Sequence, residues 1–75
     1  MAYSEALSHL QESLSVRRSR YGSGSNHPEI AQSLNDLGSV YHGLANFQQS
    51  IQSYREALEM RQQYYADQAH LYVAV

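Results

Sequence analysis

Residues 26–41 read NHPEIAQSLNDLGSVY and contain the clearest helical pattern in the chain. Apolar side chains follow one another at steps of three and four, at Ile30, Ala31, Leu34, Leu37 and Tyr41. This spacing is typical of a helix with one buried stripe. Proline is favoured in the first turn of a helix, where its missing N–H would have no partner. The stretch therefore predicts a helix that begins at Pro28, with His27 as its cap and Gly38 within its stripe.

Two other segments have the same spacing and align with each other. They are YSEALSHLQESLSVR at 3–17 and FQQSIQSYREALEMR at 47–61, which lie 44 residues apart (47 − 3). A fixed period of this size indicates a stacked helical repeat. The loop GSGSN at 22–26 separates the first two helices, because glycine and serine clusters interrupt helices. No stretch alternates long enough to predict a strand.

The stretches HPEIAQSLNDLGSVY, NFQQSIQSYREALEMR and ALSHLQESLSVRRSRYG resemble the tetratricopeptide repeat. They are most similar to the longer form found in kinesin light chains and in nephrocystin-like and NACHT-associated proteins. The resemblance covers nearly the whole chain and implies an all-α fold of antiparallel helix–turn–helix repeats, an α-solenoid fragment. Residues 1–75 would then hold the second helix of one repeat (about 3–21), a full helix pair (about 28–65) and the start of the next first helix (about 68–75). We expect the chain to be a fragment of a longer array.

Small and large residues on the stripes predict how the helices interlock. Gly38 and Ala57 are small, and we expect two helices to approach closely there. Tyr41, Phe47 and Tyr54 are large enough to fill the spaces between layers. The positions of Tyr3, Tyr41 and Tyr54 on the apolar stripes favour the core.

The second turn, HGLANF at 42–47, leaves two structures open. Residue 45 is alanine where the family commonly places a turn glycine, and an alanine held at positive φ costs on the order of 1 kcal/mol. Gly43 could shift the turn and avoid this cost. Otherwise the two helices could continue as one long helix, which would favour exchange of helices between chains. The fold class therefore includes a helix-swapped form.

Composition excludes several classes of function. The 75-residue chain has a formal net charge of −2 and no cysteine. The charge balance gives no basic patch for nucleic acid, and no apolar run reaches the roughly 20 residues of a membrane span. We therefore expect no nucleic-acid or membrane partner. The absence of cysteine and of a signal-peptide pattern favours a cytoplasmic location.

The sequence shows no constellation of reactive residues. Four histidines occur, at His9, His27, His42 and His70. None pairs with another at i, i+4, and no thiolate or carboxylate motif surrounds them. Serine, histidine and aspartate occur without the context of a nucleophile elbow. We expect no enzyme activity, no bound metal and no cofactor.

Polar residues on the 28–42 helix are the best candidates for a binding site. They lie beside the apolar stripe, at Gln32, Asn35, Asp36, Ser39 and His42. The resemblance implies that this helix lines a concave groove where peptides bind. Asparagine and glutamine side chains can hydrogen-bond an extended peptide backbone as donors and acceptors. A solvated polar face is the alternative interpretation of the same residues.

The expected function is a protein-interaction scaffold that binds peptides or partner domains without catalysis. The alternative is a self-associating module, because uncovered apolar edges would drive chains to pair or to exchange helices. Tyrosines near the C-terminal edge, Tyr64, Tyr65 and Tyr72, would then be exposed. A homo-oligomer is the partner that this alternative predicts.

Overall fold

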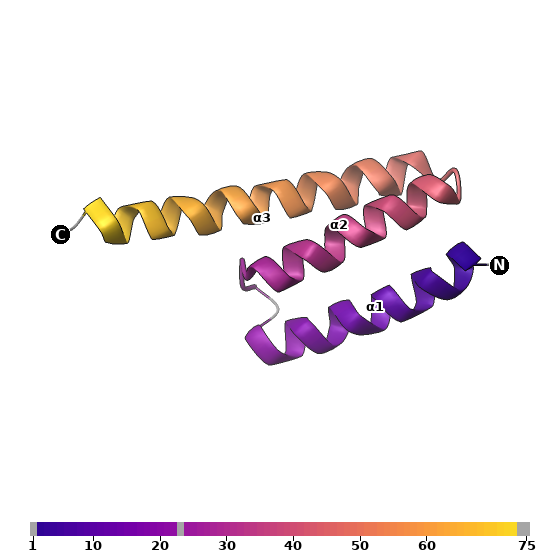
Figure 1. Cartoon of the computed structure of the whole chain (residues 1–75), viewed down its shortest axis with the longest axis horizontal. Helices are drawn as coiled ribbons and strands as arrows, with labels where there is room; N and C mark the ends of the chain where they lie inside the picture. Colours follow the sequence, from indigo (N-terminus) through magenta and orange to yellow (C-terminus); the bar gives the residue numbers. More distant parts are fainter. Residues whose placement is uncertain (1, 23, 74–75) are drawn as a thin grey trace.

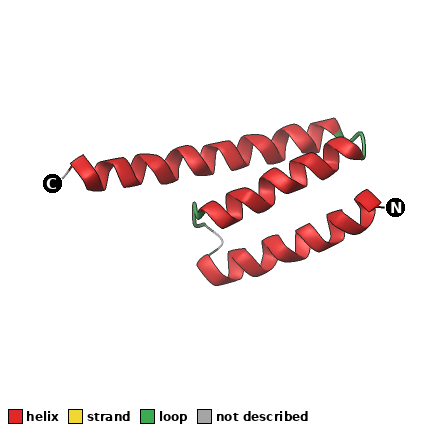
Figure 2. Cartoon of the chain, viewed as in Figure 1, coloured by secondary structure: helices red, strands yellow, loops and turns green. Residues whose placement is uncertain are grey.

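The computed structural model describes residues 2–22 and 24–73, and these residues form three helices. The helices are α1 (Ala2–Tyr21), α2 (Pro28–Gly43) and α3 (Phe47–Val73), and successive helices run antiparallel (Figure 1). Within this part of the chain there is no strand (Figure 2). None of the three helices is both long enough and apolar enough to cross a membrane. The predicted all-α helical repeat architecture is confirmed.

Helix α2 lies between α1 and α3 and packs against both. Its apolar stripe is the centre of the core, as the spacing predicted, and Leu14 of α1 and Ala57 of α3 complete the cluster. Ile30 and Ala31 are fully buried. The core is formed by Leu14, Ile30, Ala31, Leu34, Leu37 and Ala57, with Leu7, Leu10, Tyr21, Tyr41 and Met60 packed around it.

Polar contacts join the C-terminal half of α1 to the start of α2. One Arg17 guanidinium nitrogen donates hydrogen bonds to the hydroxyl of Ser33 and to the carbonyl oxygen of Glu29, both at 2.8 Å. Ser33 is buried, so this bond satisfies a hydroxyl that would otherwise be costly to enclose. These hydrogen bonds fix the position of α1 along the axis of α2, which apolar packing alone specifies less closely.

Small residues let α2 and α3 approach closely, as predicted for Gly38 and Ala57. A Cβ atom at Gly38 would lie only 2.8 Å from carbons of the Tyr54 ring. The carbonyl of Gly38 accepts a 2.7 Å hydrogen bond from the Ser50 hydroxyl. Ala57 is 1% exposed. Both predicted contact points are confirmed.

The large aromatic residues are less buried than the sequence predicted. Tyr3 and Tyr54 are 52% and 37% exposed, so their assignment to the core is wrong. Phe47, which was expected to fill the space between layers, is 55% exposed. Helix α3 presents its small side chains, Ser50, Ser53 and Ala57, to α2. Two helices can approach closely only where the side chains between them are small. Ile51, Leu58 and Tyr65 consequently face outward, whereas Tyr54 lies at the edge of the contact with its ring against Gly38.

The second turn is closed within the chain, and Ala45 adopts positive φ (60°). The Asn46 amide donates to the Tyr41 carbonyl (2.8 Å) and the Ala45 amide to the His42 carbonyl (3.0 Å). This pair of bonds is the Schellman motif, in which glycine usually occupies the position of Ala45. Gly43 remains in α2 and does not shift the turn. The structure therefore has a closed hairpin in place of one continuous helix.

Helix α3 is longer than predicted. A helix end near residue 65 and a new start near 68 were expected, but α3 continues without interruption to Val73. The sequence YYADQAHLYV at 64–73 contains neither glycine nor proline, so nothing local stops the helix. The side chains of His70 and Tyr72 and residues 74–75 lie outside the described part of the chain.

Candidate peptide-binding surface

The start of α2 is held by a cap that the sequence predicted. His27 has an extended backbone (φ −66°, ψ 137°), and its Nδ1 accepts a 3.2 Å hydrogen bond from the Glu29 amide. Its ring stacks on the ring of Tyr21, with 3.7 Å between centroids. Pro28 occupies the first turn, where no N–H is needed. His27 therefore orients α2 relative to α1 and has a structural role.

All five predicted groove residues lie on α2 and form a polar row along it. Gln32, Ser39 and His42 are exposed, while Asn35 and Asp36 are half-buried. The Gln32 amide donates a 2.9 Å hydrogen bond to the Asp36 carboxylate, one turn further along. We call this set, Gln32, Asn35, Asp36, Ser39 and His42, the α2 polar row.

The α2 polar row meets α3 along one edge. The hydroxyls of Ser39 and Tyr54 are hydrogen-bonded at 2.8 Å. Arg61 donates a 3.2 Å hydrogen bond to the Gln32 side-chain oxygen. The rings of His42 and Phe47 pack edge to face, with centroids 5.3 Å apart. These contacts hold three of the five side chains and place the row beside the outward-facing apolar residues of α3.

Asn35 differs from its neighbours in the row. Its side-chain amide forms no hydrogen bond to another described residue, although the residue is half-buried. An amide offers two N–H donors and a carbonyl acceptor. Asn35 therefore presents hydrogen-bonding capacity at the middle of the row.

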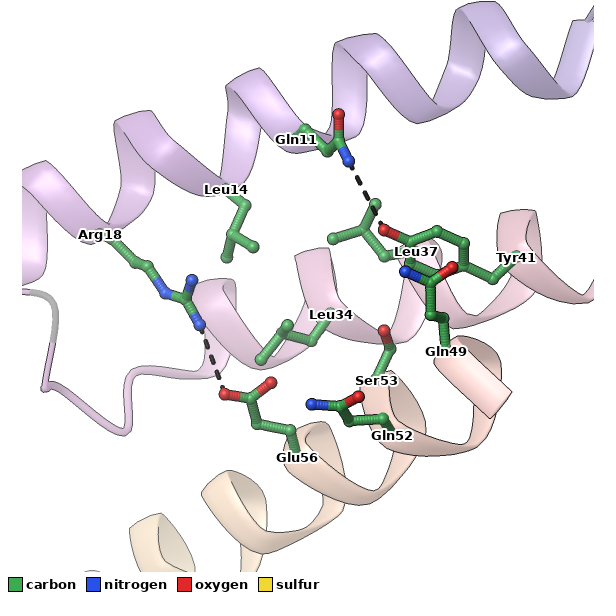
Figure 3. A pocket seen from close by; sticks show the side chains of 10 residues that line it. All are labelled: Gln11, Leu14, Arg18, Leu34, Leu37, Tyr41, Gln49, Gln52, Ser53 and Glu56. Carbon is green, nitrogen blue, oxygen red and sulfur yellow. Dashed lines mark hydrogen bonds and ion pairs between the residues drawn. The ribbon is translucent and has the colours of Figure 1, made fainter. Parts of the chain in front are cut away.

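A cleft of about 330 Å³ lies on another side of α2, between α1 and α3 (Figure 3). Leu34, Leu37 and Tyr41 of α2 form part of its lining. Gln32 and Ser39 each precede one of these residues by two positions, which is about 160° around a helix. The cleft and the polar row are thus separate surfaces. The full lining is Gln11, Leu14, Arg18, Leu34, Leu37, Tyr41, Gln49, Gln52, Ser53 and Glu56.

Two side-chain contacts bridge the walls of the cleft. Arg18 of α1 and Glu56 of α3 form an ion pair at 3.5 Å, and Gln11 donates to the Tyr41 hydroxyl at 3.5 Å (Figure 3). The side chains of the ion pair are 34% and 45% exposed, so solvent screens it and its net contribution is small. The sequence did not predict this cleft, because its lining comes from three helices whose packing brings the residues together.

The described residues contain no group of three or more histidine, cysteine, aspartate or glutamate side chains that could hold a metal ion. One carboxyl group is perturbed: the hydrogen bond from Tyr21, with the charge of Arg17 nearby, lowers the pKa of Glu29 below its ordinary value of 4.5. The Tyr21 hydroxyl is 2.6 Å from the Glu29 carboxylate. This pair joins α1 to α2 near the cap and lies outside both candidate surfaces.

Successive antiparallel helices that each pack on the next, with small residues where α2 meets α3, are typical of helical-hairpin repeat proteins. The family model described as "Tetratricopeptide repeat" matches residues 2–63. The chain belongs to the tetratricopeptide repeat family. No curated protein and no solved structure matches it significantly. Repeats of this family generally mediate protein–protein interaction and typically act as non-catalytic scaffolds.

Proposed function

We propose that the chain is a protein-interaction scaffold that docks a partner peptide on the α2 polar row. Side-chain amides and hydroxyls in the row supply donors and acceptors for the backbone of an extended segment. Its members come from one rigid helix, so they are held in place before a ligand arrives. In this role the chain binds and orients its partner and catalyses no reaction.

The observation that carries this proposal is the unpaired amide of Asn35. The polar atoms of this amide are not buried, so they are open to solvent, and the backbone of a ligand can hydrogen-bond to them in place of water. Asp36 and Ser39 flank Asn35 and have further acceptor capacity. The α3 contacts at Gln32, Ser39 and His42 limit the freedom of these side chains, and this lowers the entropy lost on binding.

Within this proposal, α2 and α3 form one helix pair, and α1 is the second helix of another. The support is the alignment of α1 with α3 at a fixed offset together with the family match. We infer from the resemblance of HPEIAQSLNDLGSVY that the repeat is of the long kinesin light chain type. This resemblance also suggests an adaptor or assembly role. A cytoplasmic location stays a prediction.

Selection of peptides from a random display library, using the whole chain as bait, tests the proposal. Selected peptides should lose about tenfold in affinity with Asn35→Ala, since a bidentate amide contact is worth roughly 1–1.5 kcal/mol. The matched control is Gln52→Ala, which removes an amide from the cleft. Peptides that lose affinity with Gln52→Ala and keep it with Asn35→Ala would contradict the assignment of the row.

A further inference from the structure

The cleft between α1 and α3 is bridged at both ends by a pair of side chains (Figure 3). At one end Arg18 and Glu56 form the ion pair at 3.5 Å, and at the other end Gln11 donates to the Tyr41 hydroxyl. Gln11 and Arg18 are seven residues apart on α1, so the two ends are about 10 Å apart. With its volume of about 330 Å³, the cleft is within the size range of small-molecule sites.

Two polar groups of the cleft have no hydrogen-bond partner among the described residues. The Nε of Arg18 is buried and forms no hydrogen bond. Ser53 is 8% exposed, and its hydroxyl lies in the lining of the cleft without a hydrogen bond to another described residue (Figure 3). Buried polar groups are normally hydrogen-bonded, so two unpartnered donors in one cleft need an explanation. A ligand with acceptor oxygens provides one.

The ion pair at the end of the cleft leaves Arg18 with unused donors. Its 3.5 Å distance exceeds the length of a charge-assisted hydrogen bond, which is about 2.7–2.9 Å. A carboxylate can bind one edge of a guanidinium through both of its oxygens, and Nε and Nη2 form such an edge. Glu56 contacts Nη2 alone. A ligand carboxylate at this edge would therefore satisfy Nε as well as Nη2.

The remaining lining of the cleft is polar but uncharged. Of the ten residues that line the cleft, Arg18 and Glu56 are the charged ones, so their charges sum to zero. A complementary ligand has one anionic and one cationic group side by side, and the rest of it is uncharged and polar. The other polar groups of the lining are the side-chain amides of Gln11, Gln49 and Gln52 and the hydroxyls of Tyr41 and Ser53.

We propose that the cleft is a binding site for a free α-amino acid with an uncharged polar side chain. The ligand carboxylate accepts hydrogen bonds from Nε and Nη2 of Arg18, and the ligand ammonium donates to the Glu56 carboxylate. One carbon of the ligand carries both charges, which matches two protein charges that lie side by side. The ligand side chain extends along the cleft toward the amides of Gln52 and Gln49. The site is independent of the α2 polar row, which is a separate surface.

A zwitterion fits the two charges better than an ion of either sign. The side chains of Arg18 and Glu56 are 34% and 45% exposed, so solvent screens their ion pair and little is lost when it opens. A ligand with a carboxylate alone would place a second negative charge beside Glu56, and a cation alone would lie beside Arg18. Like charges in contact oppose binding. A zwitterion gives each of the two side chains a partner of opposite charge.

Titration of the whole ¹⁵N-labelled chain with L-glutamine, followed by amide chemical shifts, tests the proposal. The shifts should saturate with a dissociation constant of about 1 mM, as expected for so small a ligand, and should be largest at Gln52 and Ser53. Two matched ligands are N-acetyl-L-glutamine, which lacks the ammonium, and L-glutamine α-amide, which lacks the carboxylate. Each should bind at least about tenfold more weakly, because each loses one charge-assisted contact.

Two substitutions distinguish a zwitterion from a simple carboxylate. Arg18→Gln and Glu56→Gln should each weaken L-glutamine binding about tenfold, since each removes one charged partner of the ligand. A site for a simple carboxylate would lose affinity with Arg18→Gln and gain it with Glu56→Gln. The matched controls, Arg55→Gln and Glu59→Gln, change exposed charges of α3 outside the cleft lining and should leave the affinity unchanged. Circular dichroism verifies that the variants fold.

Three results would overturn the proposal. The first is the absence of saturable shifts in the cleft up to about 50 mM L-glutamine. The second is binding of N-acetyl-L-glutamine or of the α-amide with the affinity of L-glutamine. The third is unchanged or tighter binding in Glu56→Gln. The comparison of ligands uses the unaltered chain, so it decides the question without any variant.

Discussion

The ring of Tyr54 lies against the backbone of Gly38, so closely that a Cβ atom at position 38 would be 2.8 Å from the ring. The Tyr54 hydroxyl at the same time bonds to Ser39, the next residue on α2. One tyrosine therefore couples the close approach of α2 and α3 to the position of a residue in the α2 polar row.

Gly38→Ala should lower the free energy of unfolding by about 1 kcal/mol. Overpacking costs roughly 1–3 kcal/mol, which exceeds the gain of about 1 kcal/mol that alanine offers over glycine within a helix. A shift of Tyr54 away from the new methyl would break its bond to Ser39. Urea denaturation measures the change. The control is Gly24→Ala, where no atom lies within 4 Å of the added carbon, and a comparable loss there would contradict the packing argument.

Ala45→Gly should stabilise the chain by about 1 kcal/mol, because glycine adopts positive φ without the steric cost that alanine bears. For a domain of this size the melting temperature should rise by about 4–8 °C. Ala66→Gly, in an exposed turn of α3, is the control and should destabilise by about 1 kcal/mol. Equal effects of the two substitutions would mean that residue 45 is not strained.

Leu37→Ala should destabilise by about 2–5 kcal/mol, since Leu37 is 4% exposed and its removal leaves a cavity in the core. A loss of this size approaches the whole stability of a small domain. Thermal melting followed by circular dichroism measures it. Val16→Ala, at an exposed position of α1, should change the melting temperature little. A small effect at Leu37 would show that the core is elsewhere.

Tyr21→Phe should return the pKa of Glu29 toward its ordinary value of 4.5, because the Tyr21 hydrogen bond is the main cause of the lowered pKa. A lowered pKa in the folded state stabilises the fold above pH 4.5, and this stabilisation is lost as the pH falls through the lowered value. The stability difference between wild type and Tyr21→Phe should therefore shrink below pH 4.5. NMR titration of the Glu29 carboxyl carbon measures the pKa. In Tyr65→Phe it should be unchanged, and an equal shift there would rule out the Tyr21 bond as the cause.

Features that depend on nearby residues could be predicted from the sequence. The stripe of α2 predicted its buried face, and the order His27–Pro28 predicted its cap. Gly38 marked the close approach, and Ala45 marked the strained turn. The buried face, the cap and the strained turn follow from the local backbone and from side chains within one or two helical turns. Gly38 could be predicted as a contact point because a small residue on an apolar stripe leaves room for a neighbouring helix.

The rotation of α3 could not be predicted in the same way. Its apolar arc is wide and includes both Ala57 and Leu58, so two faces compete for the contact with α2. Close approach selects the face with Ser50 and Ala57, and the bond from Ser50 to the Gly38 carbonyl satisfies a buried polar pair. The cleft could not be predicted either, because its lining comes from all three helices and depends on how α1 and α3 pack on α2.

A ¹H–¹⁵N chemical shift map of the chain, recorded with a peptide selected from the display library, identifies the surface that binds the peptide. We predict the largest perturbations at the backbone amides of Asn35, Asp36 and Ser39 and at the side-chain amide of Asn35. Perturbations concentrated at Gln11, Gln52 and Glu56 would place the ligand in the cleft instead and would contradict the claim that α2 docks partners through its polar row.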